Sequence, residues 1–418
     1  MRVQEEWTQT TVGEVLERVA DPVVVDPSKI YQEIGIRSHG KGLFDKEPVS
    51  GAVLGEKRVF WIQPDCFILN IVFAWERAVG RTTVEDVGKI ASHRFPMYRP
   101  KSGLADVDYV LHFFKTERGR ELLALASPGG AGRNKTLGQK EFLKLPLCLP
   151  PLREQRRIAE ILSSIDEAIE TTRAVIEQSG KVKQGVLNRL LTRGMGHGHF
   201  KQTEFGLIPE KWEVVPLRTV AHVQTGVAKG KKDIQDPVEL PYLRVANVQD
   251  GHIDLTELKT ITVSASQVER YSLRPGDVLM TEGGDFDKLG RGDVWKGQVP
   301  VCLHQNHVFA VRPDQELLVS EFLAALTASA HGKSYFLSCA KQTTNLASIN
   351  STQVKDFPVL LPGKEEQERI VQQVAAHALA ERSASDALAQ LEQTKAALMS
   401  NLLTGRKRVS ADALSPAL

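Results

Sequence analysis

The chain contains an internal duplication, which constrains its architecture more than any single motif does. When the sequence is shifted by 212 positions against itself, residues 145–150 fall on residues 357–362, and Glu154 and Gln155 fall on Glu366 and Gln367. The offset persists without a gap until residues 190–192 meet residues 402–404, each reading Leu-Leu-Thr. This long ungapped match predicts two copies of one structural unit.

The similarity extends upstream, with small changes in the alignment offset. Trp7 and Val12 share the spacing of Trp212 and Leu217, and each half also contains an Arg-Pro pair, at positions 99–100 and 312–313. Each half therefore has the order globular domain, then helix, and the glycine-rich residues between the halves predict a linker. The predicted boundaries are 1–150 for the first domain, 151–194 for its helix, 195–205 for the linker, 206–361 for the second domain, 362–406 for its helix and 407–418 for a tail.

The two helical regions carry heptad repeats that predict coiled-coil packing. Pro151 and Pro362 mark the expected helix starts, because proline suits a first helical turn. We expect the helices to pack antiparallel to each other as a rigid spacer; the alternative is that each lies on its own domain. The predicted seam consists of Ile158, Leu162, Ile165, Ile169, Ile176, Val186, Leu190, Ile370, Val374, His377, Leu388, Leu391, Leu398 and Leu402.

The globular halves have a different pattern, with short β-like runs separated by Gly and Pro. Residues 242–245, 277–280 and 307–311 predict strands, residues 320–329 predict a helix, and the glycine-rich residues 281–291 predict an exposed loop. The expected fold class is α/β (α+β), with two strand-rich globular domains joined by two long antiparallel helices.

Composition and motif searches exclude several classes of protein. The 53 basic and 51 acidic residues nearly cancel, so any nucleic-acid interface must arise from local placement of charge. The four cysteines form no C-x-x-C pair, and no leader or membrane-spanning stretch is evident, so we expect a cytoplasmic protein without a metal site. Residues 129–136 fail as a phosphate loop, because Asn134 replaces the required glycine. His197 and His199 are attributed to the linker, and no catalytic residues are expected.

The motifs resemble the DNA-specificity subunit of type I restriction-modification systems. The resemblance rests on residues 150–155, which read Pro-Pro-Leu-Arg-Glu-Gln before a long helix, on their copy at 362–367, and on residues 206–212 opening the second half. It implies two target-recognition domains that each read one half of a split, asymmetric site in double-stranded DNA. It also implies helices that bind two methyltransferase subunits and, through the complex, restriction and translocase subunits. The chain itself would hold no cofactor, and S-adenosylmethionine would bind the methyltransferase.

Candidate DNA-contacting residues are basic or amide side chains in glycine-rich segments, since Arg and Lys pair with guanine or phosphate and Asn and Gln with adenine. Each could instead be an ordinary solvated surface residue. They are Arg37, His39, Lys41, Arg133, Asn134, Lys135, Lys229, Lys231, Lys232, Lys288, Arg291, Lys341, Gln342 and Asn345.

Two other functions remain open at this point: a coiled-coil scaffold with two ligand-binding domains, and a fused restriction enzyme. Under the favoured hypothesis, removing the residues beyond Leu361 is expected to abolish methyltransferase assembly while the first domain still folds.

Overall fold

The computed structural model describes residues 6–129, 135–230, 234–284, 289–342 and 347–409. The chain divides into two compact units, and each contains one globular domain together with part of both long helices. Unit 1 comprises Met1–Ala174 and Asp386–Leu418, and unit 2 comprises Val175–Ser385.

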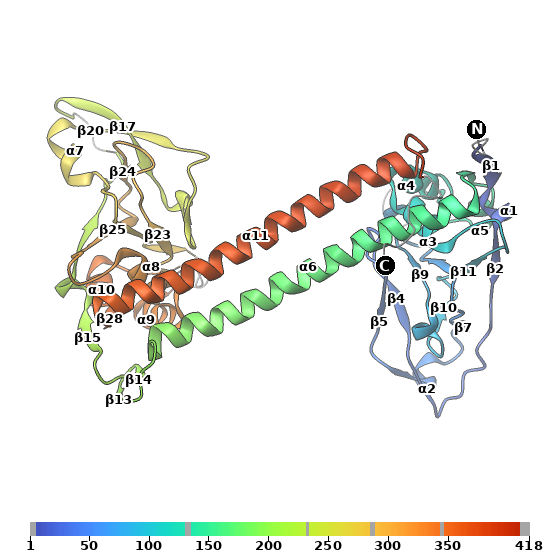
Figure 1. Ribbon diagram of the computed structural model, residues 1–418, viewed down its shortest axis with the longest axis horizontal. Helices are drawn as coiled ribbons and strands as arrows, with labels where there is room; N and C mark the ends of the chain where they lie inside the picture. Colours follow the sequence, from blue (N-terminus) through green and yellow to red (C-terminus); the bar gives the residue numbers. More distant parts are fainter. Residues whose placement is uncertain (1–5, 130–134, 231–233, 285–288, 343–346, 410–418) are drawn as a thin grey trace, which may run out of the picture. The chain divides into compact units, whose positions relative to one another are not determined.

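The domain of unit 1 is built on an antiparallel sheet of strand order β2-β11-β8-β9, which is covered by short helices (Figure 1). Its core includes Phe67, Tyr98, Phe114 and Phe142. The elements are β1 Thr8–Thr11, α1 Val12–Val15, β2 Leu16–Val19, β3 Ile30–Tyr31, β4 Ile34–Ile36, β5 Leu43–Asp45, β6 Val49–Ser50, α2 Gly51–Leu54, β7 Val59–Trp61, β8 Phe67–Leu69, η1 Ala74–Glu76, β9 Val79–Arg81, η2 Val84–Asp86, β10 Ile90–Ser92, β11 Met97–Pro100, α3 Val107–Lys115, α4 Glu117–Leu125, α5 Gln139–Leu143 and β12 Pro146–Leu149.

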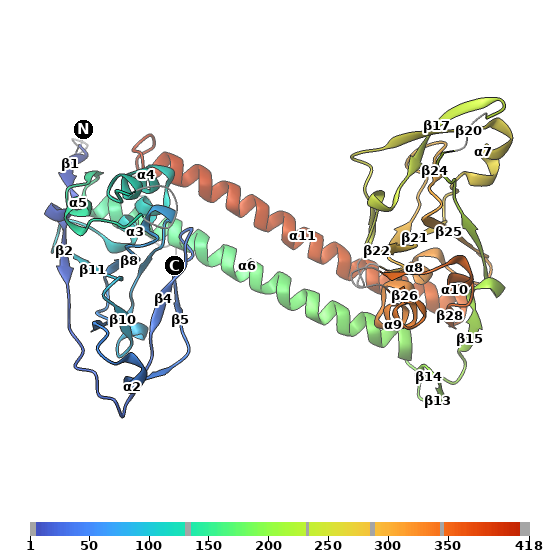
Figure 2. The ribbon, with the colours of Figure 1, turned by 180° about the vertical axis from the view of Figure 1, so that it is seen from behind.

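Unit 2 repeats this scaffold with the sheet order β16-β25-β21-β23. Its α8 and α9 lie beside the ends of the long helices in this unit (Figures 1 and 2). The elements are β13 Phe200–Thr203, β14 Gly206–Pro209, β15 Glu213–Pro216, η3 Leu217–Thr219, β16 Ala221–Thr225, β17 Pro237–Leu243, η4 Val245–Asn247, β18 Val248–Gln249, β19 His252–Ile253, β20 Lys259–Ser264, α7 Ala265–Tyr271, β21 Val278–Thr281, β22 Gly283–Gly284, β23 Gly292–Val294, β24 Leu303–His304, β25 Val308–Pro313, α8 Ser320–Ala328, α9 Ala330–Cys339, β26 Lys341–Gln342, β27 Ala347–Ser348, α10 Ser351–Lys355 and β28 Pro358–Leu361.

The duplication predicted from the sequence is confirmed at the level of strand pairing. In unit 1 the first strand of the domain, β1, pairs antiparallel with the last, β12, and in unit 2 β15 pairs with β28 in the same way. The predicted strands at 277–280 and 307–311 correspond to β21 and β25, and the predicted helix corresponds to α8. The predicted loop at 281–291 is partly wrong, because Gly283 and Gly284 form β22 and pair with β27.

Both long helices begin where their prolines predict. Helix α6 spans Leu152–Arg193 and helix α11 spans Lys364–Leu402. The carbonyls of Pro151 and Gly363 accept the first helical hydrogen bonds, at 2.8–3.1 Å. Gly363 is thus able to take the place that Pro151 holds in the first copy.

The predicted seam residues are all buried or half-buried. In unit 1 the start of α6 packs with the end of α11, since Ile158 and Leu162 share a core with Leu402. Arg173 and Glu392 form an ion pair at 2.6 Å along the same contact. In unit 2 the end of α6 meets the start of α11, where Leu190 and Val374 pack against the buried cluster that contains Ile370. Within each unit the helices run antiparallel. They also pack on the domain cores. The helices therefore both pair with each other and lie on the globular domains.

A glutamine fixes each helix start to its domain. Gln155 Nε2 donates to the carbonyls of Pro150 and Leu104 at 2.9 and 3.2 Å, and its Oε1 accepts from Asp106 N at 3.0 Å. Asp106 in turn caps α3. This glutamine therefore couples the long helix to the first helix of the domain.

Gln367 makes the same three contacts in unit 2. Its Nε2 donates to the carbonyls of Pro362 and Leu317, both at 2.9 Å, and its Oε1 accepts from Val319 N at 2.9 Å. Each glutamine is buried and satisfied by three hydrogen bonds to main-chain groups, which is a physical reason for a glutamine at this position in both copies.

The neighbouring glutamates have different partners in the two units. Glu154 accepts from the Arg408 guanidinium at 2.7–3.1 Å and from Val409 N at 3.2 Å. Glu366 accepts from Trp212 Nε1, Met195 N and His197 Nε2, at 3.0, 2.9 and 2.7 Å. These contacts contradict the predicted linker and the predicted folding of a chain that ends at Leu361.

The predicted linker is wrong in part. Met195 and His197 bind the start of α11, and residues 200–203 form strand β13 of a hairpin with β14. The alternation of Phe200, Lys201, Gln202 and Thr203 is too short to be recognised by its period alone.

The expectation that the first domain folds without the residues beyond Leu361 is also not supported. Leu402 and Leu403 are buried in the core of unit 1, and Arg408 binds Glu154 in the same unit. Their removal would expose apolar core surface and leave Glu154, which is 6% exposed, without its cation. We therefore expect such a truncation to destabilise the first domain.

Candidate nucleic-acid interface

Three of the predicted contact residues lie in the turn between β4 and β5. Arg37, His39 and Lys41 are exposed, and the Arg37 guanidinium lies 4.6 Å from the Phe44 ring. His39 has a positive φ of 63° and its N donates to the Glu76 carbonyl at 2.7 Å. The turn is therefore anchored on the end of η1 while its basic side chains face solvent.

Lys135 approaches the same η1 segment from elsewhere in the chain. Its Nζ lies 5.3 Å from the centre of the Trp75 ring, a cation–π contact. Lys135 and the Arg37–Lys41 turn thus both contact η1. Arg133 and Asn134 lie outside the described residues.

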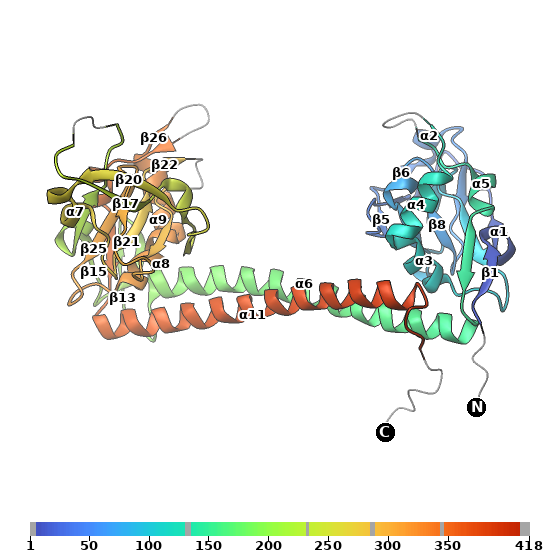
Figure 3. The same ribbon diagram turned by 90° about the horizontal axis from the view of Figure 1, so that it is seen from above.

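In unit 2 the predicted contact residues Lys341 and Gln342 lie in the same small sheet as part of the glycine-rich segment 281–291. Lys341 and Gln342 form β26, which pairs with β27, and β27 pairs in turn with β22 of the glycine-rich segment. Both side chains are exposed. In Figure 3, β22 and β26 lie on the side of unit 2 away from α6 and α11.

The remaining predicted residues of unit 2 are placed as follows. Arg291 is half-buried, and its carbonyl accepts from Thr281 N at 3.1 Å. Lys229 is exposed, with its Nζ 5.6 Å from the Tyr242 ring on β17, so it contacts a different sheet. Lys231, Lys232, Lys288 and Asn345 lie outside the described residues.

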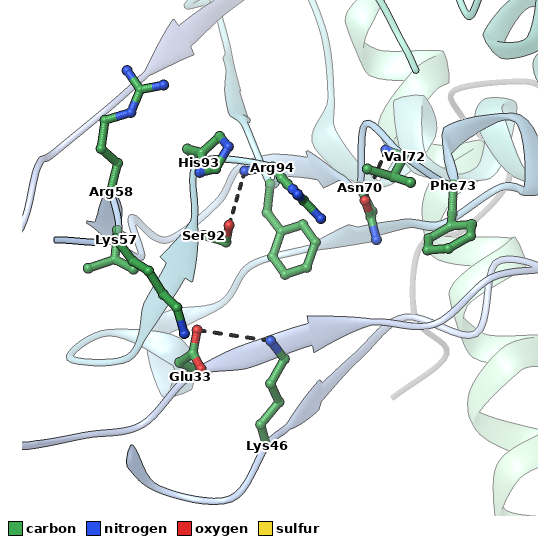
Figure 4. Close-up of a pocket in the computed structure, with 12 residues that line it drawn as sticks. Glu33, Lys46, Lys57, Arg58, Asn70, Val72, Phe73, Ser92, His93 and Arg94 are labelled. Carbon is green, nitrogen blue, oxygen red and sulfur yellow. Dashed lines mark hydrogen bonds and ion pairs between the residues drawn. The ribbon is translucent and has the colours of Figure 1, made fainter. Parts of the chain in front are cut away.

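A basic cavity in unit 1, with a volume of about 440 Å³, was not predicted from the sequence. It is lined by charged and aromatic side chains from several separate segments (Figure 4). Its only sequence signals are the dipeptides at 57–58 and 93–94, which are too short to stand out among 53 basic residues. The residues that supply its charge and aromatic surface are Glu33, Lys46, Lys57, Arg58, Phe73, His93, Arg94 and Phe95.

Strand pairing explains how these segments meet. β7 and β10 pair antiparallel, and beyond the pair His93 N donates to the Arg58 carbonyl at 3.1 Å. On the opposite wall, Asn70 is buried and its Oδ1 accepts from Val72 N at 3.0 Å, which fixes the turn after β8. The cavity is therefore built on backbone contacts, and its basic side chains project from this frame.

A second basic cavity, of about 640 Å³, lies along β16 and α7 in unit 2. Arg270 and Arg274 line it together with Arg312. Arg312 is committed to the buried Asp277, with two hydrogen bonds of 2.7 Å. This arginine stabilises the sheet, so less of the cavity's charge is available to a ligand.

Burial favours the neutral form of two cysteine thiols and one histidine imidazole in the described part of the chain. Burial raises the pKa of the Cys66 thiol, and it raises the pKa of Cys302 to about 12. Burial lowers the pKa of His304, whose Nδ1 lies 2.7 Å from the Val308 carbonyl. Neutral thiols and a neutral imidazole in such surroundings serve packing and internal hydrogen bonds.

Comparison with known proteins places this arrangement in a family. A family model for the type I restriction modification DNA specificity domain matches residues 63–178 and 209–392, one stretch in each half. These stretches cover more than half of the chain. The chain belongs to this family.

Curated members of the DNA-specificity family resemble parts of the chain. The putative type I restriction enzyme MjaX specificity subunit of Methanocaldococcus jannaschii is 30% identical over 173 residues, which are 41% of this chain and 40% of that protein. The EcoKI specificity subunit of Escherichia coli is 25% identical over 312 residues, 71% of this chain and 65% of that protein. The match thus spans less than two thirds of either relative's length.

Solved structures of the family share the fold along nearly the whole chain. The HsdS subunit from Thermoanaerobacter tengcongensis has a TM-score of 0.51 at 17% identity, covering 97% of this chain and 99% of that one. The type I restriction-modification S subunit from M. genitalium has a TM-score of 0.54 at 13% identity, covering 96% and 97%. The predicted fold class, with two strand-rich domains and two long helices, is confirmed.

Two further observations bear on the site. Within the described ranges, no group of three or more His, Cys, Asp and Glu side chains is arranged to hold a metal ion. No helix in this part of the chain is long and apolar enough to cross a membrane.

Proposed function

We propose that this chain is the DNA-recognition subunit of a type I restriction-modification complex, and that each globular domain reads one half of a bipartite, asymmetric site in double-stranded DNA. One observation supports this most: the two domains share one scaffold but present different side chains on it. Family membership supports the same conclusion. Two non-identical readers suit two non-identical half-sites.

The long helices are proposed to bind two methyltransferase subunits, which would carry S-adenosylmethionine, and through them the restriction subunits. Apolar side chains on the helices support this. Val175 and Val182 on α6 are 51% and 48% exposed, and Leu379 on α11 is 67% exposed. Val175 and Val182 are seven residues apart and share one helix face. An apolar stretch on one face of an exposed helix can be covered by a partner protein.

In this proposal the chain acts in the cytoplasm, where the host DNA is, and contributes no catalytic group. The scaffold hypothesis lacks a specific supporting observation, since the exposed segments of the two domains carry basic and amide side chains.

The experiment is to express the chain with its cognate methyltransferase subunit and to map methylated bases in host DNA by single-molecule sequencing. We expect one bipartite motif that disappears when the gene for this chain is deleted. Methylation that is unchanged by the deletion would contradict the proposal.

A further inference from the structure

The basic cavity of unit 1 lies beyond the end of β8 and before the start of β11, since Asn70 and Arg94 line it. Ile71 follows β8, and its N donates to the Arg94 carbonyl at 3.0 Å, just before β11 begins. The Ile71 carbonyl accepts from Leu137 N at 2.8 Å. Three separate segments are thus joined at one residue, beside the cavity.

Unit 2 contains the same junction. Glu282 N donates to the His307 carbonyl at 3.0 Å, and the Glu282 carbonyl accepts from Ile349 N at 2.8 Å. Beside this junction is a cavity of about 540 Å³, to which Glu282, His307 and Lys341 contribute. By backbone hydrogen bonding, Glu282 is equivalent to Ile71 and His307 to Arg94. The two cavities therefore occupy one position in a duplicated scaffold.

The cavity of unit 1 has a surplus of positive charge. Lys46 is 4.0 Å from Glu33, the carboxylate among the lining residues. Among the described residues, no ion pair engages Lys57, Arg58 or Arg94, all of which are exposed. Lys46 Nζ also lies 5.7 Å from the centre of the Phe95 ring. A surplus of cations in a cavity with aromatic side chains favours an anionic, planar ligand such as nucleic acid.

The cavity of unit 2 has a different character at the same position. Glu282 accepts a hydrogen bond from His307 Nδ1, so one carboxylate oxygen is engaged within the cavity wall. Gly283 and Gly284 line the cavity without side chains, and Lys341 provides a cation. This surface combines a carboxylate acceptor with glycines that leave space for a ligand to approach the backbone closely.

We propose that these two equivalent cavities are the base-reading sites of the two domains, with Arg94 as a guanine-reading residue of the first half-site and Glu282 as an acceptor for a base amino group in the second. An arginine donates to guanine O6 and N7, and a carboxylate accepts from the cytosine amino group, which gives each site a different preference. The inference rests on the proposed function, because it requires that the domains read DNA.

The test uses the assembled complex of the full chain and its cognate methyltransferase, with selection from a random pool of duplex DNA. The variants are Arg94→Ala, Lys57→Ala and Glu282→Gln. The matched control is Lys144→Ala, which removes another exposed lysine of unit 1, paired with Glu141 at 2.9 Å. Thermal unfolding of each variant shows whether it folds as the unaltered chain does.

Arg94→Ala is expected to reduce the preference for guanine about tenfold at a position in one half-site and to leave the other half-site unchanged. Glu282→Gln is expected to change only the other half-site. Lys57→Ala is expected to weaken DNA binding through the same half-site that Arg94→Ala alters. Lys144→Ala is expected to change neither the binding nor the selected sequence.

The failures are distinguishable. If the unaltered complex selects no bipartite sequence, the proposed function fails. If it selects one and the Arg94 and Glu282 variants select the same sequence with the same preference, or bind all sequences uniformly more weakly, the inference is overturned.

Discussion

The two halves of this protein are most instructive where they differ on a shared frame. Gln155 and Gln367 make the same three hydrogen bonds, yet the adjacent Glu154 binds Arg408 and the adjacent Glu366 binds His197 and Trp212. The glutamines keep the same contacts to main-chain groups, while the side chains that bind the two glutamates differ. Parts of the frame that are satisfied by backbone groups tolerate sequence change, because a hydrogen bond to a main-chain atom does not depend on the partner's identity.

The comparison also shows how each domain is completed by a distant segment. Leu191 at the end of α6 is fully buried in unit 2, and Leu403, its counterpart in the repeat, is 4% exposed in unit 1. Each long helix therefore begins at one domain and ends in the core of the other unit.

The largest expected effect comes from truncating these leucines. Leu403→Ala should destabilise unit 1 and Leu191→Ala should destabilise unit 2, each by about 2–4 kcal/mol, because a cavity remains in a packed core. Hydrogen–deuterium exchange resolves the two units peptide by peptide. The exposed Leu379→Ala serves as a control, and loosening of the wrong unit would contradict the packing described here.

The glutamates should have a smaller effect. Glu366→Gln weakens a buried acceptor that serves His197, Trp212 and Met195, and we expect a loss of about 2 kcal/mol in unit 2. Glu154→Gln should cost about 1 kcal/mol in unit 1, because Arg408 can turn to solvent. Urea unfolding of both variants measures the difference, and equal losses would show that the two partners stabilise the helix starts equally.

A pH titration should test the burial of one histidine in unit 1. Burial, followed by the charge of Lys115, lowers the pKa of His112 from 6.5 to about 4, while Asp166 opposes this and Lys395 adds to it. The unfolded chain therefore binds the proton more readily, so this contribution to stability is present above pH 6.5 and declines as the pH falls toward 4.

His112→Gln should flatten the pH dependence of unit 1 unfolding between pH 7 and 4, and the exposed His199→Gln should leave it unchanged. Exchange measurements at several pH values test this. A slope that persists in the His112 variant would assign the effect to other groups.

The smallest effect on the fold is expected on the helix surface. Val182→Asp should change the free energy of unfolding by no more than about 0.5 kcal/mol, since the side chain is exposed. It should nevertheless reduce co-purification with the methyltransferase subunit if that helix face is a docking surface. Full recovery of the complex would remove this face from the proposed interface.

The sequence by itself determined the duplication, the helix starts and the seam. These features are periodic or local: a heptad reports which face is buried, and a proline fixes its own backbone. The strands β21 and β25 of the second domain were predicted for a similar reason, because residues 277–280 and 307–311 form short local apolar runs. Lys341 and Gln342 are joined to Gly283 and Gly284 only through β27, and no local pattern predicts that pairing.

Only the tertiary structure decided which distant side chains meet. The basic cavity of unit 1 depends on pairing of β7 with β10 and on the turn after β8, and no local pattern connects Lys57 with Arg94. Arg408 lies 254 positions beyond Glu154, and its place in unit 1 follows from the return of α11 to that unit. Contacts of this kind depend on how the chain closes its long loops, whereas sequence periodicity reports only the burial of neighbouring residues.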